Sequence, residues 1–194
     1  MWKHPLTWVG LFLLIGVVAV WDYSPEDLLR QPQPEQERFP QAYMLQSQTR
    51  RYNTEGELHY RMTSARADYF QYLPERSSPR DYSLIQSPDV TVFGEGEQPW
   101  RLTARLGHSN AAADRLRFTG DVRVWQAHAG GRTEITTPEL LVEPNRQYAE
   151  TSKAVKMRSP QGQHEAIGMR ADLSKNHIEL LSEVRGTYEP TTAN

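Results

Sequence analysis

The sequence contains no cysteine among its 194 residues. Disulfide bonds, thiolate zinc sites and thiol nucleophiles are therefore excluded, and the redox compartment of the protein is left undetermined. A strong net charge is also absent, because 22 Lys and Arg stand against 24 Asp and Glu, which gives a formal net charge of −2. The chain therefore has no overall positive field that would attract nucleic acid.

Catalytic motifs are absent as well. The sequence has no HExxH metal motif, no P-loop, no nucleophile elbow and no dinucleotide-binding glycine fingerprint. The neighbours His164 and Glu165 are better explained as solvated strand residues than as metal ligands. Glu134 and Glu139 are interpreted as exposed charges and not as an acid–base pair. We therefore predict no catalytic residue, no metal site, no cofactor and no nucleic-acid partner, so the protein is not expected to be an enzyme.

Hydrophobic residues make up only 38% of the chain, and the one long uncharged run is Pro5–Trp21. At 1.5 Å per residue this run spans roughly 25 Å, slightly less than a ~30 Å hydrocarbon core. Trp2 and Tyr23 can extend it as interfacial anchors. A cleaved secretory signal is the alternative, but such a signal would end in small residues, whereas bulky Trp21 stands at this exit. Residues 1–23 are therefore predicted to form an uncleaved transmembrane helix.

The charges that flank this helix predict its orientation. Lys3 lies before the span and Asp22 follows it, so the N-terminus is expected in the cytoplasm and the rest of the chain on the exported side. Gly10 and Gly16 are small positions that would let another membrane helix approach closely, although ordinary transmembrane glycines are an equally simple explanation. Residues 24–41 are rich in Pro, Gln and Glu and are predicted to form an extended spacer.

A period-two pattern dominates the rest of the chain and is clearest at Arg115–Gln126. The apolar positions there are Leu116, Phe118, Val122 and Val124. Alternation of this kind predicts a half-buried strand, with Gly120 as a bulge or bend. The same outline returns at Asn176–Val184 and more faintly at Tyr148–Ala154, which gives a repeat of roughly thirty residues.

Strands separated by Gly, Pro and Asn turns fill residues 42–190, and residues 191–194 form a short tail. The expected strands are Tyr43–Arg51, Leu58–Ala67, Tyr69–Tyr72, Tyr82–Phe93, Trp100–Leu106, Arg115–Gln126, Arg132–Glu143, Tyr148–Met157, Gly162–Asp172 and His177–Tyr188. Many short strands at even spacing predict an all-β sandwich or an open barrel. The loop Leu73–Asp81 is interpreted as an insertion with no assigned role.

The combination of anchor, polar spacer and all-β domain with the motif D-x-L-x-F-x-G-D-V resembles the LptC family, the bitopic inner-membrane component of the lipopolysaccharide transport system. The stretches that carry the resemblance are Tyr52–Met62, Arg66–Phe70, Asp114–Val124, Thr133–Thr137, Gly168–Asp172 and Asn176–Tyr188. The resemblance implies a twisted, partly open β-jellyroll of OstA-like repeats. It also implies a protein that takes lipopolysaccharide from the LptB/LptF/LptG ABC transporter and passes it to an LptA-type periplasmic bridge protein.

Alternation selects the residues that we expect to face the lipid in such a groove. They are Tyr60, Met62, Val92, Ala104, Phe118, Val122, Met169, Ala171 and Leu180. Unpaired strand edges would dock partners by strand addition. The expected edge residues are Tyr43, Leu45 and Ser47 toward the transporter and Val184, Gly186 and Tyr188 toward the bridge protein. The same apolar residues would also suit a dry sandwich core, so a membrane-anchored scaffold that only docks partners remains the alternative.

Overall fold

The computed structural model describes residues 39–73, 75–94, 98–175 and 177–188. The predicted anchor 1–23 with Gly10 and Gly16, most of the spacer 24–41 and the tail 191–194 lie outside these residues. Among the residues that are described, no helix has the length and apolar character needed to cross a membrane.

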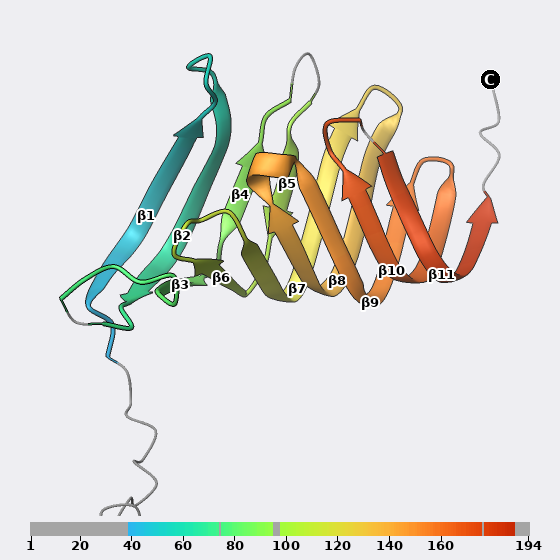
Figure 1. Cartoon of the computed structure of the whole chain (residues 1–194). Coiled ribbons are helices and arrows are strands. Elements are labelled where there is room, and N and C mark those ends of the chain that lie inside the picture. The colour runs from blue at the N-terminus through green and yellow to red at the C-terminus, as the bar shows by residue number, and fades with distance from the viewer. Residues whose placement is uncertain (1–38, 74, 95–97, 176, 189–194) are drawn as a thin grey trace, which may run out of the picture. The chain divides into compact units, whose positions relative to one another are not determined.

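Eleven strands form one antiparallel sheet within the described residues, so the all-β prediction is confirmed and the arrangement is consistent with a β-jellyroll. They are β1 (Ala42–Tyr52), β2 (Leu58–Phe70), β3 (Tyr82–Gln86), β4 (Asp89–Val92), β5 (Trp100–Thr103), β6 (Leu106–Asn110), β7 (Leu116–His128), β8 (Gly131–Glu143), β9 (Tyr148–Ser159), β10 (Gly162–Asp172) and β11 (His177–Tyr188). A 3-10 turn, η2 (Pro144–Arg146), joins β8 to β9. Neighbours in sequence are mostly neighbours in the sheet, from β1 at one end to β11 at the other (Figure 1).

Two of the expected strands are each broken in the middle. The stretch 82–93 divides into β3 and β4 at Ser87 and Pro88, where Ser87 has a φ of 50° and the proline has no N–H to donate. The stretch 100–106 divides into β5 and β6 at the same level of the sheet. Backbone hydrogen bonds continue across the break, because Ser87 N–H donates to Arg105 O at 2.9 Å and Arg105 N–H donates to Gly120 O at 2.8 Å.

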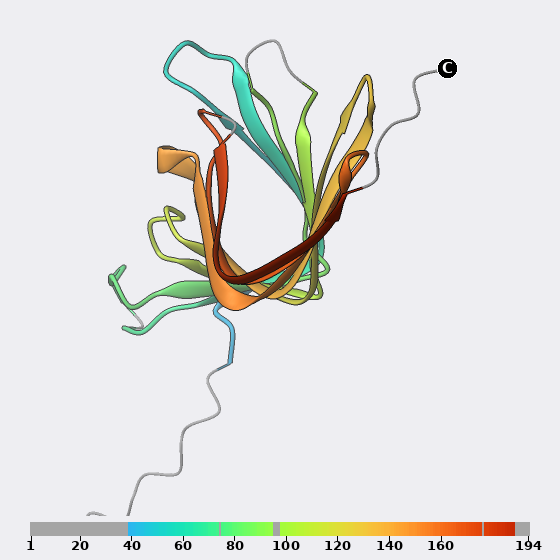
Figure 2. The same cartoon turned by 90° about the vertical axis from the view of Figure 1, so that its right-hand side faces the viewer.

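The long strands bend at this level without breaking. In β7, Gly120 has a φ of 76° and Asp121 a φ of 52°, and the register with β8 shifts between Thr119 and Val122. The bulge predicted at Gly120 is therefore confirmed. Gly168 in β10 and Glu183 in β11 also adopt positive φ values, of 81° and 51°. These bends fold the strands into a trough with two walls, which is seen along its length in Figure 2.

Strand β2 runs as one element, whereas the sequence suggested a break near Asp68. That carboxylate is buried, with 8% of the residue exposed. Arg66 Nε donates to both of its oxygens, at 2.8 and 2.9 Å. The prediction of two strands was wrong because a charged residue can stay inside a strand when a neighbouring guanidinium pairs with it.

A second buried carboxylate, Asp81, organises the loop that leads into β3. It is 2% exposed and accepts hydrogen bonds from the backbone N–H of Tyr72 and Ser78, both at 2.8 Å, and from the Tyr69 hydroxyl at 3.0 Å. The two backbone donors, followed by the Tyr69 hydroxyl, hold the pKa of Asp81 below its usual value of 3.8. The loop that had no assigned role is thus tied to the sheet by one ionised side chain.

Replacing Asp81 with asparagine is expected to destabilise the strand unit in a pH-dependent way. Because the folded state lowers the pKa of Asp81, its contribution is complete above the unfolded value of about 3.9 and is lost as the pH falls through the folded pKa. The stability gap between wild type and Asp81→Asn should therefore be constant at neutral pH and close in acid. Urea denaturation between pH 7 and pH 2.5 measures this gap. The exposed loop residue Glu75 provides the control, and an equal gap for Glu75→Gln would contradict the assignment.

Candidate functional site

A row of cross-strand partners, called here the first ladder, lines the inner face of one wall of the trough. It consists of Ala67, Ile85, Gly107, Phe118 and Leu140, which are successive partners from β2 to β8, and continues with Thr151, Met169 and Leu180 on β9 to β11. Phe118 is 1% exposed. A Cβ at Gly107 would lie 3.4 Å from Ile85 Cβ and 3.5 Å from the Phe118 ring, so the missing side chain leaves room for that ring.

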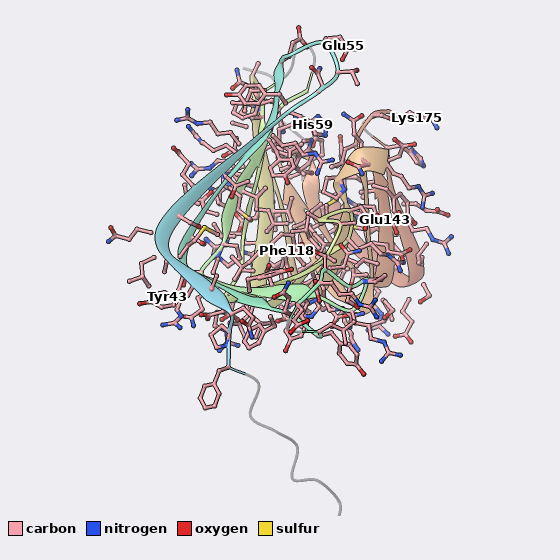
Figure 3. All side chains as sticks on the ribbon, turned by 60° about the vertical axis from the view of Figure 1, so that its left-hand side comes forward. Tyr43, Glu55, His59, Phe118, Glu143 and Lys175 are labelled. Carbon is pink, nitrogen blue, oxygen red and sulfur yellow. The ribbon has the colours of Figure 1, made fainter. Side chains whose placement is uncertain are left out.

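The second ladder lines the other wall, on the far side of the bend. It consists of Met62, Val90, Leu102, Val124, Ile135 and Met157, which are successive partners from β2 to β9. It ends with His164 on β10 and Gly186 on β11. Both walls therefore carry apolar side chains across most of the sheet. Figure 3 shows Phe118 in the interior and Tyr43 on the outside.

Members of both ladders face one apolar cleft. Its lining includes Met62, Val90, Leu102, Val124 and Ile135 from the second ladder and Phe118, Leu140 and Met169 from the first. The free space between these side chains is about 70 Å³. An apolar cavity of this kind stays dry, because a water molecule inside it would find none of the 2–4 polar partners that it needs. The apolar part of the lining therefore suits hydrocarbon.

One hydrogen bond joins the two walls at the mouth of the cleft. His59 Nε2–H, on β2, donates to the carbonyl oxygen of Pro144, on η2, at 3.4 Å. His59 and Pro144 both line the cleft, together with Arg101 and Gln147. The polar groups of the cleft thus lie at its rim, while its interior is apolar.

The structure brings together most of the residues predicted to face lipid. Those that line the cleft are Tyr60, Met62, Val92, Phe118, Met169 and Ala171. Ala104 and Leu180 pack against the same core without lining the cleft. Val122 is 0% exposed and lies outside the lining, because it follows directly after the bulge at Gly120 and Asp121.

Several cleft residues were missed by alternation alone. Trp100, Ile135 and Ala149 line the cleft, and none of them lay on a clearly apolar stretch of sequence. Ile135 stands between polar residues, and Ala149 is too small to mark an apolar face. Trp100 is the first residue of an expected strand, but the sequence pattern did not indicate that it lies at the boundary of the cleft.

Both predicted edge strands lie at the ends of the sheet. Within the described residues β1 pairs only with β2, and β11 pairs only with β10. Of the side chains expected at these edges, Tyr43 is 61% exposed, Val184 52% and Tyr188 75%, and Leu45 is exposed as well. Ser47 differs, because its Oγ lies 2.7 Å from Oγ of the buried Ser64. Gly186 is exposed, although a Cβ there would lie 2.5 Å from His164 Nδ1.

The described residues contain no group of three or more His, Cys, Asp or Glu side chains that could hold a metal ion.

A family model with the description "Lipopolysaccharide-assembly, LptC-related" matches residues 9–189. The chain belongs to the LptC family. Membership assigns it to the non-enzymatic components of lipopolysaccharide transport, in agreement with the expectation that it is not an enzyme.

No curated protein matches this LptC-family chain. Among solved structures, it is similar to LptH, the LptA-homologous periplasmic component of the lipopolysaccharide transport device of Pseudomonas aeruginosa. The TM-score is 0.49 at 10% sequence identity, and the match covers 68% of this chain and 95% of that chain. A likeness at this level assigns no function to individual residues.

Proposed function

We propose that this LptC-family chain receives lipopolysaccharide from the inner-membrane ABC transporter formed by LptB, LptF and LptG and passes it to an LptA-type periplasmic bridge protein. The observation that supports this role is the apolar cleft between the two ladders. Each methylene removed from water contributes about 0.8 kcal/mol, so a lipid with several acyl chains does not cross an aqueous compartment unaided. A trough with apolar walls keeps the chains covered while the sugars stay in water.

Acyl chains enter this cleft only if its walls separate, because the free space in this structure is about 70 Å³. The same small volume favours a second function. In that alternative the apolar ladders are an ordinary dry core, and the protein is a membrane-anchored scaffold that binds its partners through its strand edges alone. The two functions differ in whether lipid ever touches the inner face of the walls.

Photo-cross-linking in cells that make lipopolysaccharide separates the two functions. A photoreactive residue at Met62, which lines the cleft and is only half-buried, is expected to give an ATP-dependent adduct with lipopolysaccharide. Phe118 is a poorer position, because it is 1% exposed and a larger side chain there would disturb packing. The matched control is Arg61, the preceding residue on β2, whose exposed side chain points to the opposite face.

An adduct at Met62 and none at Arg61 would support transfer through the cleft. Equal adducts at both positions would indicate that lipid adheres to the outer surface. No adduct at either position, in a folded protein that still copurifies with its partners, would refute lipid transfer and favour the scaffold.

The strand edges are proposed as the docking surfaces for the protein partners. An edge strand has a row of backbone N–H and C=O groups that can pair with a strand of another protein. We assign β11, with Val184, Gly186 and Tyr188, to the bridge protein and β1, with Tyr43, Leu45 and Ser47, to the transporter. Copurification of the bridge protein with the chain measures the first docking, and it should be lost when the end of β11 is deformed.

We further propose that residues 1–23 anchor the chain in the inner membrane, with the N-terminus in the cytoplasm and the β-jellyroll in the periplasm. Gly10 and Gly16 are the positions proposed to pack against helices of the transporter. An integral helix resists extraction, so the full chain should stay in membranes that are washed with alkaline carbonate. Release of the chain into the supernatant would refute the anchor.

A further inference from the structure

The apolar character of the second wall stops at one level of the strands. The second ladder places Val124, Ile135 and Met157 side by side on β7, β8 and β9. Two residues farther toward the hairpin tips, the same face carries Gln126, Thr133 and Ser159, because side chains two apart in a strand share a face. Gln126 and Thr133 are themselves cross-strand partners. The wall therefore changes from hydrocarbon to amide and hydroxyl groups in one step.

These polar side chains line a basin that adjoins the apolar cleft. The polar side chains of its lining belong to Gln98, Gln126, His128, Thr133, Ser159 and Gln161. Trp100 and Ile178 also line the cleft, so the two spaces meet at these residues. The basin has a volume of about 640 Å³, which lies within the range of roughly 300–1,000 Å³ found for small-molecule sites.

The lining of the basin selects for a neutral, hydroxyl-rich ligand. Charged residues make up 24% of the chain, yet none of the lining residues is Asp, Glu, Lys or Arg. A phosphate or carboxylate group would find no fixed cation there. The amides of Gln98, Gln126 and Gln161 can each donate and accept, and the hydroxyls of Thr133 and Ser159 can do the same, which suits the hydroxyl groups of a sugar.

The polar groups of the basin are partly arranged before any ligand arrives. Gln126 Nε2–H donates to the carbonyl oxygen of Gln98 at 2.7 Å, which leaves the Gln126 amide oxygen as a fixed acceptor. His128 Nε2 lies 3.2 Å from Thr133 Oγ1. A buried indole N–H of Trp100, at the boundary with the cleft, has no hydrogen-bond partner among the described residues. A hydroxyl oxygen placed at that boundary would satisfy this donor, which otherwise costs free energy.

We propose that this basin is a subsite for neutral sugar, and that it holds part of the glycan of lipopolysaccharide while the acyl chains occupy the cleft. The inference rests on the proposed transfer function and adds the recognition of the sugar to it. Trp100 stands at the junction, because it lines both the cleft and the basin. The basin thus fixes which end of the amphipathic lipid faces the mouth of the trough.

Equilibrium binding of two lipids to the purified full chain in detergent tests the subsite. The probes are lipid A alone and lipopolysaccharide that carries a complete core oligosaccharide. Wild type is expected to bind the core-bearing form about tenfold more tightly. The double variant Gln126→Leu with Thr133→Val should bind both forms equally, with the wild-type affinity for lipid A. The control Thr136→Val lies on β8 in a separate surface hollow that includes Arg105 and Lys156, and it should keep the tenfold preference.

Each of the other possible results overturns the proposed subsite, and each shows which part of the proposal fails. If the double variant keeps the preference for the core-bearing form, the sugar binds elsewhere. If it loses affinity for lipid A by the same factor, the two residues only shape the apolar cleft. If wild type binds both lipids equally well, the subsite fails while lipid transfer stands. If wild type binds neither lipid, the proposed transfer function fails and the subsite fails with it.

Discussion

Replacing Phe118 with alanine is expected to lower the free energy of unfolding by about 3–5 kcal/mol, the range measured when a buried Phe is truncated. The Phe118 side chain is 1% exposed and is paired across the strands with Gly107 on one side and Leu140 on the other. Gly107 has no side chain that could move into the vacated space, and Ile85 lies beyond it. The truncation therefore leaves a cavity at the centre of the first ladder.

Urea denaturation followed by the fluorescence of Trp100 and Trp125 measures this loss. The neighbouring residue Arg117 is the matched control, because its side chain is 58% exposed and its nearest carboxylate oxygen, on Glu139, lies 3.9 Å away. Arg117→Ala should change the stability by less than about 1 kcal/mol. A small loss for Phe118→Ala as well would contradict the packed ladder and would indicate a wall that stands open to solvent or lipid.

Replacing Gly162 with alanine is expected to detach the C-terminal end of β11. Gly162 has a φ of 143°, and a Cβ placed there would lie 2.0 Å from the backbone oxygen of Thr187. Both the backbone conformation and the contact exclude an L side chain, and backbone cannot move aside as a flexible side chain can. The pairs Gly162 with Tyr188 and Gln163 with Thr187 should therefore open. The cleft is lined from other strands and by Ile178, at the opposite end of β11, and should remain.

Amide hydrogen exchange of the last residues of β11 measures this opening, and a loss of protection of about tenfold or more is expected. Copurification of the bridge protein should fall with it, because the strand edge that docks the partner is no longer held straight. Gly130→Ala is the control in the adjacent hairpin, where the nearest atom to an added Cβ is His128 Nδ1 at 3.6 Å. Full protection in Gly162→Ala would contradict the close approach, and normal copurification after loss of protection would contradict docking through this end.

The period-two alternation predicted the sheet well because it records a physical requirement of each strand separately. A strand such as 116–128 needs one apolar face whatever lies opposite. The pattern alone therefore identified Leu116, Phe118 and Val124 as residues of the inner face. The breaks at Ser87 and Pro88 and the continuity through Asp68 depend instead on specific contacts of single residues, which the alternation of apolar and polar positions does not record. Arg66 makes Asp68 acceptable inside β2, and Arg105 receives the backbone N–H of Ser87 at the bend.

The cleft could be predicted only in part for the same reason. Alternation indicated which side chains share the inner face, but it could not distinguish residues at the bend, such as Val122, from residues on the walls. Nor could it show how closely the walls approach or that His59 reaches Pro144. The basin beyond the second ladder combines isolated Gln, Thr and Ser residues from separate hairpins, and only the folded register reveals that they adjoin the cleft.

The bend has a mechanical consequence for the trough. Each long strand belongs to both walls, and its backbone bends at one level, at positions such as Gly120 and Gly168. The hydrogen-bonded register couples each long strand to its neighbours, so a change in the bend of one strand is passed to the next. The sheet therefore bends as a unit along the one line where its strands change direction. Spreading the two walls would therefore distribute the deformation over many strands and would not concentrate it in one.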